Sequence, residues 1–342
     1  MNYYFFIFFC SALLSAILTI VVKFVALKFN IVDEPNTERK IHQEKMPLLG
    51  GVAVFLSFFI ILFFAKEKLL VGNLESSHWI FFFVGACFLM VGGFLDDKYK
   101  LKPSQQIIWP VLASFAVVLG GVSIEKITNP FGGYIFLNSF GFYLFNLSGL
   151  VIVFWLMGMM YTTKLLDGID GLVAGVVAIG GFVIFIFTMA TKYYQPDVGL
   201  AALILAASCF GFLIFNWYPA KIFLGEGGSL FLGYALGTLA IISGGKIAIA
   251  LLVMGIPIMD VFWTIARRIR EGKNPFKFAD RKHLHYRLLD FGLSQRKVVL
   301  IFYCLSLFFG LSALFLQSRG KVFALGILVL IMLSTVARFG RK

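Results

Sequence analysis

The chain has 342 residues, of which 60% are hydrophobic and only 14% are charged, and its mean hydropathy is +0.92. Since about a quarter of the residues in soluble domains are charged, this composition excludes a soluble protein. The net charge of +13 would suit a nucleic-acid-binding protein. A membrane protein gains the same excess from lysine and arginine in its cytoplasmic loops, so we expect no nucleic acid partner.

Apolar runs recur along the whole chain at roughly the 17–25 residues that a helix needs to cross a bilayer. We therefore expect an all-α polytopic membrane protein with about ten to eleven transmembrane helices, forming a single integral membrane domain over residues 1–342. The runs lie near residues 3–27, 48–65, 78–95, 105–122, 141–160, 173–190, 198–215, 228–244, 246–266, 298–316 and 320–337.

One connecting segment differs in character from the others. Residues 127–147 place Pro-Phe-Gly-Gly and Asn-Ser between β-branched and aromatic residues. This alternation of turn residues with strand-forming residues predicts a short β-hairpin.

The distribution of charge assigns the loops to the two sides of the membrane. With the N-terminus outside, one side receives residues 28–47, 96–104, 161–172, 216–227, 267–297 and the C-terminal Arg-Phe-Gly-Arg-Lys. These loops hold 22 of the 30 lysines and arginines, so the positive-inside rule places them in the cytoplasm and the hairpin on the periplasmic side. They also hold 12 of the 17 acidic residues, which topology alone does not require. We therefore expect a polar site on the cytoplasmic face of the inner membrane.

Two polar clusters precede the middle of the chain. The first runs from Asp33 to Gly51 and contains Lys40 and His42; it is either a basic loop beside anionic lipid or a contact surface for a nucleotide or phosphate. The second is the adjacent pair Asp96 and Asp97, at the end of a membrane-length run. Neighbouring carboxylates repel each other and are costly at a membrane edge, so the pair indicates a divalent cation or a phosphate group more than a helix cap.

Two further clusters combine carboxylates with glycine. Asp167 and Asp170 are three residues apart and would share a face on a helix, and the glycines beside them allow a close approach of backbone or ligand. Asn216 supplies a neutral oxygen ten residues before Glu226, which lies in a Gly-rich turn at a helix start, where free backbone N–H groups favour anions.

The most basic loop contains His283, His285 and Arg287. Two histidines alone make a poor transition-metal site, but with the surrounding cations they could hold diphosphate oxygens or sugar hydroxyls. The alternative is a polybasic segment on the membrane surface. Because Mg²⁺ prefers one or two carboxylates together with phosphate oxygens, the clusters together predict a magnesium site, with manganese as the alternative, and a nucleotide-linked substrate. The bilayer suggests a lipid as the second reactant.

The chain resembles the polyprenyl-phosphate N-acetylhexosamine-1-phosphate transferases, glycosyltransferase family 4, from about residue 33 to 292. The motifs that carry the resemblance, in chain order, are DEPNTERKIHQEKMPLLGG, FLDDKYKLKPS, DGIDGLVAG, FNWYPAKIFLGEGGSLFLG, PIMD and ADRKHLHYRLL. The resemblance implies transfer of a sugar 1-phosphate from a UDP-N-acetylhexosamine to a polyprenyl phosphate, with release of UMP, as the first step of a cell-envelope glycan such as O-antigen or teichoic acid.

The wording of the last motif bears on the subgroup. His-Leu-His-Tyr is closer to the His-x-His-His pattern of the enzymes that use UDP-GlcNAc with undecaprenyl phosphate than to the three consecutive histidines of the phospho-MurNAc-pentapeptide transferases, which stay the alternative. A homodimer is compatible with a bundle of this kind, although no residue indicates one.

The resemblance also implies roles for individual residues. The residues implied to be catalytic are Asp96, Asp97, Asp167, Asp170 and His283. Those implied to bind substrate are Lys40, His42, Lys164, Asn216, His285 and Arg287. Those implied to bind metal are Asp97, Asp170, Asn216 and Glu226.

Four positions depart from the motifs of the resembled family. Glu226 stands in place of aspartate, Lys164 in place of asparagine and Gln106 in place of lysine, and Tyr286 replaces the last histidine. We expect Lys164 to pair with Asp167 or to contact a phosphate. The departures also permit a diverged paralogue with an unusual substrate.

Two other classes of protein would explain part of this pattern. A lipid-linked transporter would place its polar groups near the bilayer midplane, whereas here nearly all of them lie at the ends of the apolar runs. A polybasic scaffold on anionic lipid would explain the cations but not the two acidic pairs.

Overall fold

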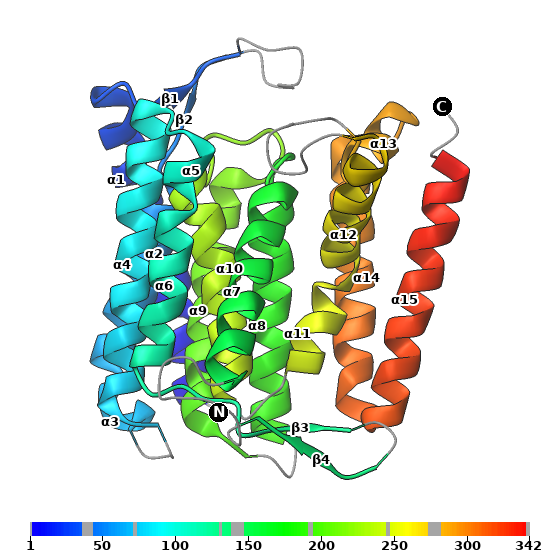
Figure 1. Ribbon diagram of the computed structural model, residues 1–342. Helices are drawn as coiled ribbons and strands as arrows, with labels where there is room; N and C mark the ends of the chain where they lie inside the picture. The colour runs from blue at the N-terminus through cyan, green and yellow to red at the C-terminus, as the bar shows by residue number, and fades with distance from the viewer. Residues whose placement is uncertain are drawn as a thin grey trace.

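The computed structural model describes residues 2–35, 44–70, 74–129, 132–137, 147–190, 194–243, 247–272 and 282–339. Figure 1 shows a bundle of long helices that lie side by side, with short elements gathered at its two ends. The helices are α1 (Asn2–Lys28), α2 (Gly50–Phe64), α3 (Lys66–Leu69), α4 (Ser76–Tyr99), α5 (Pro103–Gln106), α6 (Ile108–Leu119), α7 (Leu147–Leu166), α8 (Leu172–Ala190), α9 (Pro196–Asn216), α10 (Gly225–Ile242), α11 (Ile247–Val253), α12 (Gly255–Arg270), α13 (Leu284–Asp290), α14 (Gln295–Phe315) and α15 (Ser318–Phe339).

The expected all-α polytopic membrane fold is confirmed. Within the described part of the chain, seven helices are long and apolar enough to cross a bilayer, and α11 with α12, bent by 78° at their junction, makes an eighth if the two count as one span. Helices also fill the three other expected runs, but α2 has only 15 residues and residues 103–119 form a shorter apolar pair. The expected ten to eleven is therefore reached only when these shorter helices and α15 are included.

The structure places the hairpin and the charged loops at opposite ends of the bundle. Strands β3 (Lys126–Thr128) and β4 (Tyr134–Phe136) pair in antiparallel register, with Ile127 opposite Ile135, which confirms the expected β-hairpin. Residues 138–146 of the expected segment lie outside the described residues. At the other end lie α5, α13 and the strand pair β1 (Val32–Asp33) and β2 (Met46–Pro47) (Figure 1). The grouping of loops from the sequence is thus seen in space.

Helix α10 forms the centre of the bundle and is buried along almost its whole length. It meets its neighbours through glycine: a Cβ built on Gly51 of α2 would lie 2.0 Å from the Cα of Gly228, and one built on Gly93 of α4 would lie 2.1 Å from the Cα of Gly227. Small residues at such contacts let helix backbones approach closely in a membrane. The start of α10 is therefore held directly against the end of α4, where the first acidic pair lies.

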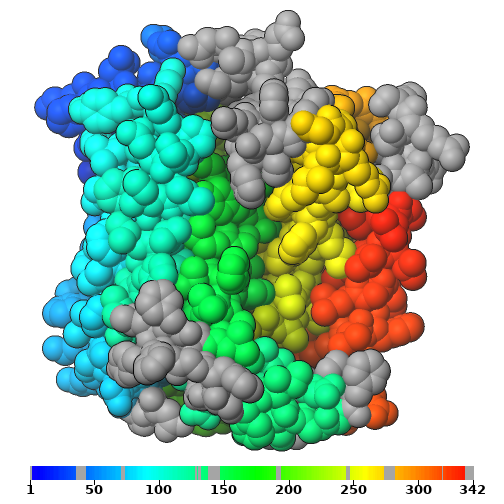
Figure 2. All heavy atoms as spheres, in the orientation of Figure 1, coloured from blue at the N-terminus to red at the C-terminus, as the bar shows by residue number. Residues whose placement is uncertain are grey.

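Figure 2 shows one face of the molecule, where the outer helices lie. Helix α7 is seen between α4 and α6 on one side and α12 on the other. Helix α7 also packs on α10. The end of α7 that carries Lys164 therefore lies beside the start of α10 and the end of α4.

Candidate functional site

The carboxylate of Asp96 closes the turn that follows α4. Lys100 ends the helix in the left-handed region, with φ of 53°, and its N–H donates to the carbonyl of Asp96. The Oδ1 of Asp96 then accepts hydrogen bonds from the N–H of Leu101 at 2.8 Å and from the Nε2 of Gln106 at 3.0 Å. The side chain of Asp96 therefore fixes α5 relative to α4.

The carboxylate of Asp97 faces the start of α10. Both of its oxygens accept from the N–H of Glu226, at 3.1 and 3.2 Å, so it caps the positive end of that helix. Gly225 adopts φ of +74°, and a Cβ there would lie 2.6 Å from the Oδ2 of Asp97. Only glycine suits this turn, which explains the Gly-rich motif around Glu226.

Lys164 joins the two carboxylates into one network. At the end of α7, its Nζ donates to the Oε1 of Gln106 at 3.0 Å and forms an ion pair with the carboxylate of Glu226. Contacts between the ends of four helices connect Asp96, Gln106, Lys164, Glu226 and Asp97 in this order, and we call this set the polar ring. The expected pairing of Lys164 with Asp167 is replaced by the pair with Glu226, whose extra methylene extends its reach.

The second acidic pair lies in the turn between α7 and α8. Asp167 and Asp170 do not share a helical face, because the chain leaves the helix at Asp167 and Gly171 turns it with φ of +78°. The Oδ2 of Asp170 accepts from the N–H of Ala220 at 3.0 Å. The surrounding protein atoms, and then the carboxylates of Glu226 and Asp170, raise the pKa of Asp167 to about 7, although the residue stays exposed to solvent, which reduces the cost of its ionisation.

Asn216 and Tyr303 hold this turn from two sides. The Oδ1 of Asn216 accepts from the N–H of Gly171 at 3.0 Å, and its Nδ2 donates to the carbonyl of Ile222 at 3.0 Å. The Tyr303 hydroxyl of α14 donates to the carbonyl of Gly171 at 2.5 Å. The buried amide of Asn216 is therefore a tie between two loops, and its Oδ1 keeps one lone pair for a further contact. No sequence pattern indicated a role for Tyr303, a tyrosine inside an apolar run.

A buried carboxylate orients the histidine loop. The Nδ1 of His283 lies 2.8 Å from the Oδ2 of Asp260 on α12, and the Oδ1 of Asp260 accepts from the N–H of Leu284 at 2.9 Å. Asp260 and His283 are only 5% and 4% exposed, so the pair is shielded from water. Asp260 is the last residue of the PIMD motif, but it is absent from the residues to which the resemblance assigns a role. A carboxylate inside the expected run 246–266 was the signal that could have found it.

His285 is fully buried between His283 and the turn of the second acidic pair. Its ring stacks on that of His283, with centroids 5.7 Å apart, and a Cβ on Gly168 would lie 2.5 Å from its Nε2. Burial lowers the pKa of His285 to about 3, so the ring is neutral, and within the described residues neither ring nitrogen has a hydrogen-bond partner. We call Asp260, His283 and His285 the histidine cluster.

Two neighbours of the histidine cluster complete the loop. The hydroxyl of Tyr286 donates to the carbonyl of Gly168 at 3.3 Å, and so takes a structural contact where the resembled family has histidine. The Nε of Arg287 donates to the carbonyl of Lys282 at 2.8 Å, at the start of α13. Lys40 and His42 lie outside the described residues.

The site offers oxygen donors for a divalent cation. Among the residues that the structure describes, no three His, Cys, Asp or Glu side chains converge closely enough to form a metal site. Yet Asp97, Asp167 and Glu226 lie within electrostatic reach of one another, and carboxylates are the donors that Mg²⁺ prefers. Since Mg²⁺ commonly takes one or two carboxylates and fills its other positions with water and phosphate oxygens, this donor set fits it.

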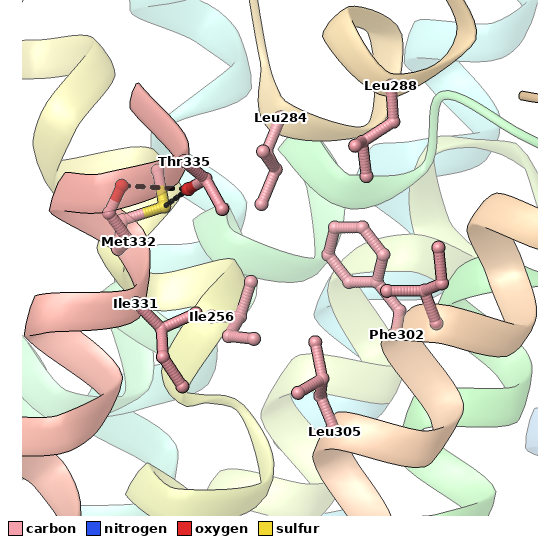
Figure 3. A pocket seen from close by; sticks show the side chains of 9 residues that line it. Ile256, Leu284, Leu288, Phe302, Leu305, Ile331, Met332 and Thr335 are labelled. Atoms are coloured by element: carbon pink, nitrogen blue, oxygen red, sulfur yellow. Dashed lines mark hydrogen bonds between the residues drawn. The ribbon is translucent and has the colours of Figure 1, made fainter. Parts of the chain in front are cut away.

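Two hollows lie near these residues. An apolar pocket of about 80 Å³ lies between α12, α13, α14 and α15, and Figure 3 shows its lining of aliphatic and aromatic side chains with Thr335 as the polar member. It carries no charged side chain, so it is a gap in apolar packing beneath α13. A smaller hollow of about 10 Å³ between α2, α4 and α10 is lined by apolar side chains, among them Met90 and Phe94, and by Asp97.

Comparison with known proteins shows which family has a similar sequence. A model of the family described as glycosyl transferase family 4 matches residues 79–244, which include the polar ring and the second acidic pair but not the histidine cluster. The chain is 34% identical over 334 residues to the probable undecaprenyl-phosphate N-acetylglucosaminyl 1-phosphate transferase of Bacillus subtilis, covering 95% of this chain and 89% of the relative.

Two other relatives carry different names. The chain is 29% identical to the decaprenyl-phosphate N-acetylglucosaminephosphotransferase of Mycobacterium leprae, over 97% of this chain and 89% of the relative. It is 30% identical to a phospho-N-acetylmuramoyl-pentapeptide-transferase of Halalkalibacterium halodurans, over 81% of this chain and 86% of the relative.

Proposed function

Because this chain belongs to glycosyl transferase family 4 and is a multi-pass membrane transferase, we propose that it moves a HexNAc-1-phosphate, and specifically GlcNAc-1-phosphate, from a UDP-sugar to a polyprenyl phosphate such as undecaprenyl phosphate. The products are UMP and a lipid-diphosphate-sugar that starts a cell-envelope glycan. The observation that carries the proposal is the gathering of the polar ring, the second acidic pair and the histidine cluster at one end of a membrane bundle.

The reaction joins two anionic reactants. A phosphate oxygen of the lipid attacks the phosphorus that carries the sugar, forms a new P–O bond there and breaks the bond between that phosphorus and UMP. Mg²⁺ held by one or two of the carboxylates of Asp97, Asp167, Asp170 and Glu226 would neutralise the charge of the diphosphate. The rest of catalysis is positioning and electrostatic stabilisation by the protein.

Of the first acidic pair, Asp97 is the better placed to meet the lipid phosphate. Both Asp96 contacts are internal to the α4–α5 turn, whereas Asp97 lines a hollow whose other walls are apolar side chains. A lipid phosphate arriving from the bilayer would pass such walls. Asp97 would then orient the phosphate and accept its remaining proton.

The histidine cluster supplies the opposite side of the substrate. Asp260 holds the ring of His283 in one orientation through Nδ1, so that the other ring nitrogen would be available to a phosphate or sugar oxygen. Arg287 and the basic residues of the same loop add positive charge. The neutral His285 fills the space between this loop and the second acidic pair.

The proposed membrane orientation places this end in the cytoplasm, where UDP-sugars are made. It is supported by the lysine and arginine excess in the loops that the structure gathers there. Transfer of a muramyl-pentapeptide is the second candidate, favoured by the likeness to the Halalkalibacterium halodurans protein.

The test is a transfer assay with membranes that contain the protein, a polyprenyl phosphate, Mg²⁺ and a panel of UDP-HexNAc donors together with UDP-MurNAc-pentapeptide. Lipid-linked product and UMP from UDP-GlcNAc would support the proposal. Product from the pentapeptide donor alone would support the second candidate. No product from any donor, with folded protein, would reject both.

A further inference from the structure

Three of the four departures from the family motifs lie in contact with one another. Gln106, Lys164 and Glu226 come from α5, α7 and α10, and Lys164 contacts both of the others. Separate drift at three positions gives no reason for them to meet. Their contact indicates that the three substitutions belong together and that they rearrange the charges inside the polar ring.

The chemistry of the three side chains is matched. The amide of Gln106 donates through Nε2 to Asp96 and accepts through Oε1 from Lys164, which a lysine at position 106 could not do. Two ammonium groups at positions 106 and 164 would repel each other. An aspartate at position 226 would be one methylene shorter and would reach Lys164 less readily.

The ammonium of Lys164 lies in a confined and strongly acidic place. Its side chain is 21% exposed and that of Glu226 is 18% exposed, so water screens the pair only in part. Asp96 and Asp97 are the other acidic members of the ring, and Asp97 lies against the first turn of the helix that carries Glu226. A positive charge in contact with Glu226 offsets repulsion among these carboxylates.

We propose that Lys164 is a built-in counter-cation of the polar ring, which competes with a divalent metal ion for Glu226 and so sets how strongly the site binds that ion. Gln106 and Glu226 are the positioning partners that keep Lys164 in this place. The proposal rests on the proposed function in one respect, that the acidic end of the bundle takes up a divalent cation.

The test measures metal binding without any sugar donor or lipid. The purified full-length protein in detergent is titrated with MgCl₂ after EDTA treatment, and the midpoint of thermal unfolding, Tm, is followed. Lys164→Gln should lower Tm in EDTA and tighten the apparent Kd for Mg²⁺ on the order of tenfold, since one close positive charge is removed. Glu226→Gln should weaken Mg²⁺ binding, and the double variant should return close to the wild-type Kd.

The matched control is Lys98→Gln. Lys98 follows Asp97 on α4 but is exposed and lies over the rings of Phe94 and Tyr99, at 5.9 and 5.4 Å from their centroids. Lys98→Gln removes the same charge at the same end of the bundle, and its Kd for Mg²⁺ should stay at the wild-type value. An equal tightening in Lys98→Gln would overturn the proposal, because the effect would then be one of overall charge.

Other outcomes are equally decisive. Unchanged Mg²⁺ affinity in Lys164→Gln would overturn the proposal. If that variant does not fold, Gln106→Lys adds a second cation beside Lys164 and should weaken Mg²⁺ binding, and an unchanged Kd there would overturn it. The expected pattern in Kd without product from any UDP-sugar would keep this inference and reject the proposed function, and the reverse result would do the opposite.

Discussion

The polar ring and the histidine cluster are built in opposite ways. The ring joins partly exposed charged groups at helix ends through contacts between α4, α5, α7 and α10. The cluster is a buried carboxylate that fixes one imidazole while a second, neutral imidazole stacks on it. The comparison teaches that different charged side chains can make up the ring, whereas the cluster depends on the single carboxylate of Asp260 that holds His283.

The largest effect should come from removing the metal. EDTA should stop transfer completely and Mg²⁺ should restore it, because the carboxylates around the ring otherwise lack a cation that can also bind the diphosphate. The check is UMP release with and without EDTA. Turnover that persists after complete chelation would show that the ring does not need a metal ion for transfer.

Asp97→Asn should lower the transfer rate by about 100-fold or more, because the amide removes the charge that orients the lipid phosphate. Tm should change little, since one side-chain oxygen can still accept from the N–H of Glu226. Asp96→Asn is the control, with a smaller loss of rate, because Asp96 closes a turn. Equal losses in the two variants would contradict the separate roles of the pair.

Asp260→Asn should act on both activity and stability. It leaves His283 buried beside a neutral amide, and losing a hydrogen bond to a charged group costs about 2 kcal/mol. The rate should fall by about 10- to 100-fold through loss of orientation. A fall in rate with an unchanged Tm would show that the pair is not a structural anchor and would remove this contrast with Asp97.

The second acidic pair and the histidine cluster should also differ in their response to pH. Because its surroundings raise the pKa of Asp167, more of it is ionised at pH 8 than at pH 6, so Mg²⁺ affinity should rise by up to about tenfold across this range. His285, with a pKa of about 3, stays neutral throughout and contributes nothing. Titrations of Mg²⁺ at both values, in wild type and in Asp167→Asn, provide the check, and a flat wild-type response would contradict it.

The smallest effect is expected from Tyr303→Phe. The ring is kept, but the hydroxyl that bonds to the carbonyl of Gly171 is lost, at a cost of about 1 kcal/mol. The turn that carries Asp170 should loosen, with a fall in rate of about threefold to tenfold and a weaker Kd for Mg²⁺. A change in rate without any change in the Kd for Mg²⁺ would contradict a role of Tyr303 in holding the turn that carries Asp170.

The sequence could predict those features that have few alternative explanations. Apolar length indicates a spanning helix, and acidic pairs such as Asp96 and Asp97 at the ends of such runs indicate a polar site, because a membrane offers them no other use. The positions of the hairpin and of the charged loops followed from the same patterns.

The sequence could not predict contacts between distant helix ends. Lys164 lies three residues from Asp167 but pairs with Glu226, because the chain leaves α7 at that point and α10 approaches from another direction. The roles of Asp260 and Tyr303 also depend on which helices become neighbours, and no periodicity or spacing encodes that choice.

The glycine contacts between α2, α4 and α10 have a consequence for the accuracy of the site. Gly93 and Gly227 meet backbone to backbone, one turn before Asp97 and next to Glu226, with no side chain between them to absorb a displacement. A single added methyl group there would push the two backbones apart, and the displacement would change the positions of both carboxylates. The accuracy with which Asp97 and Glu226 are placed therefore depends on glycines in the packed helices, which take no part in the reaction.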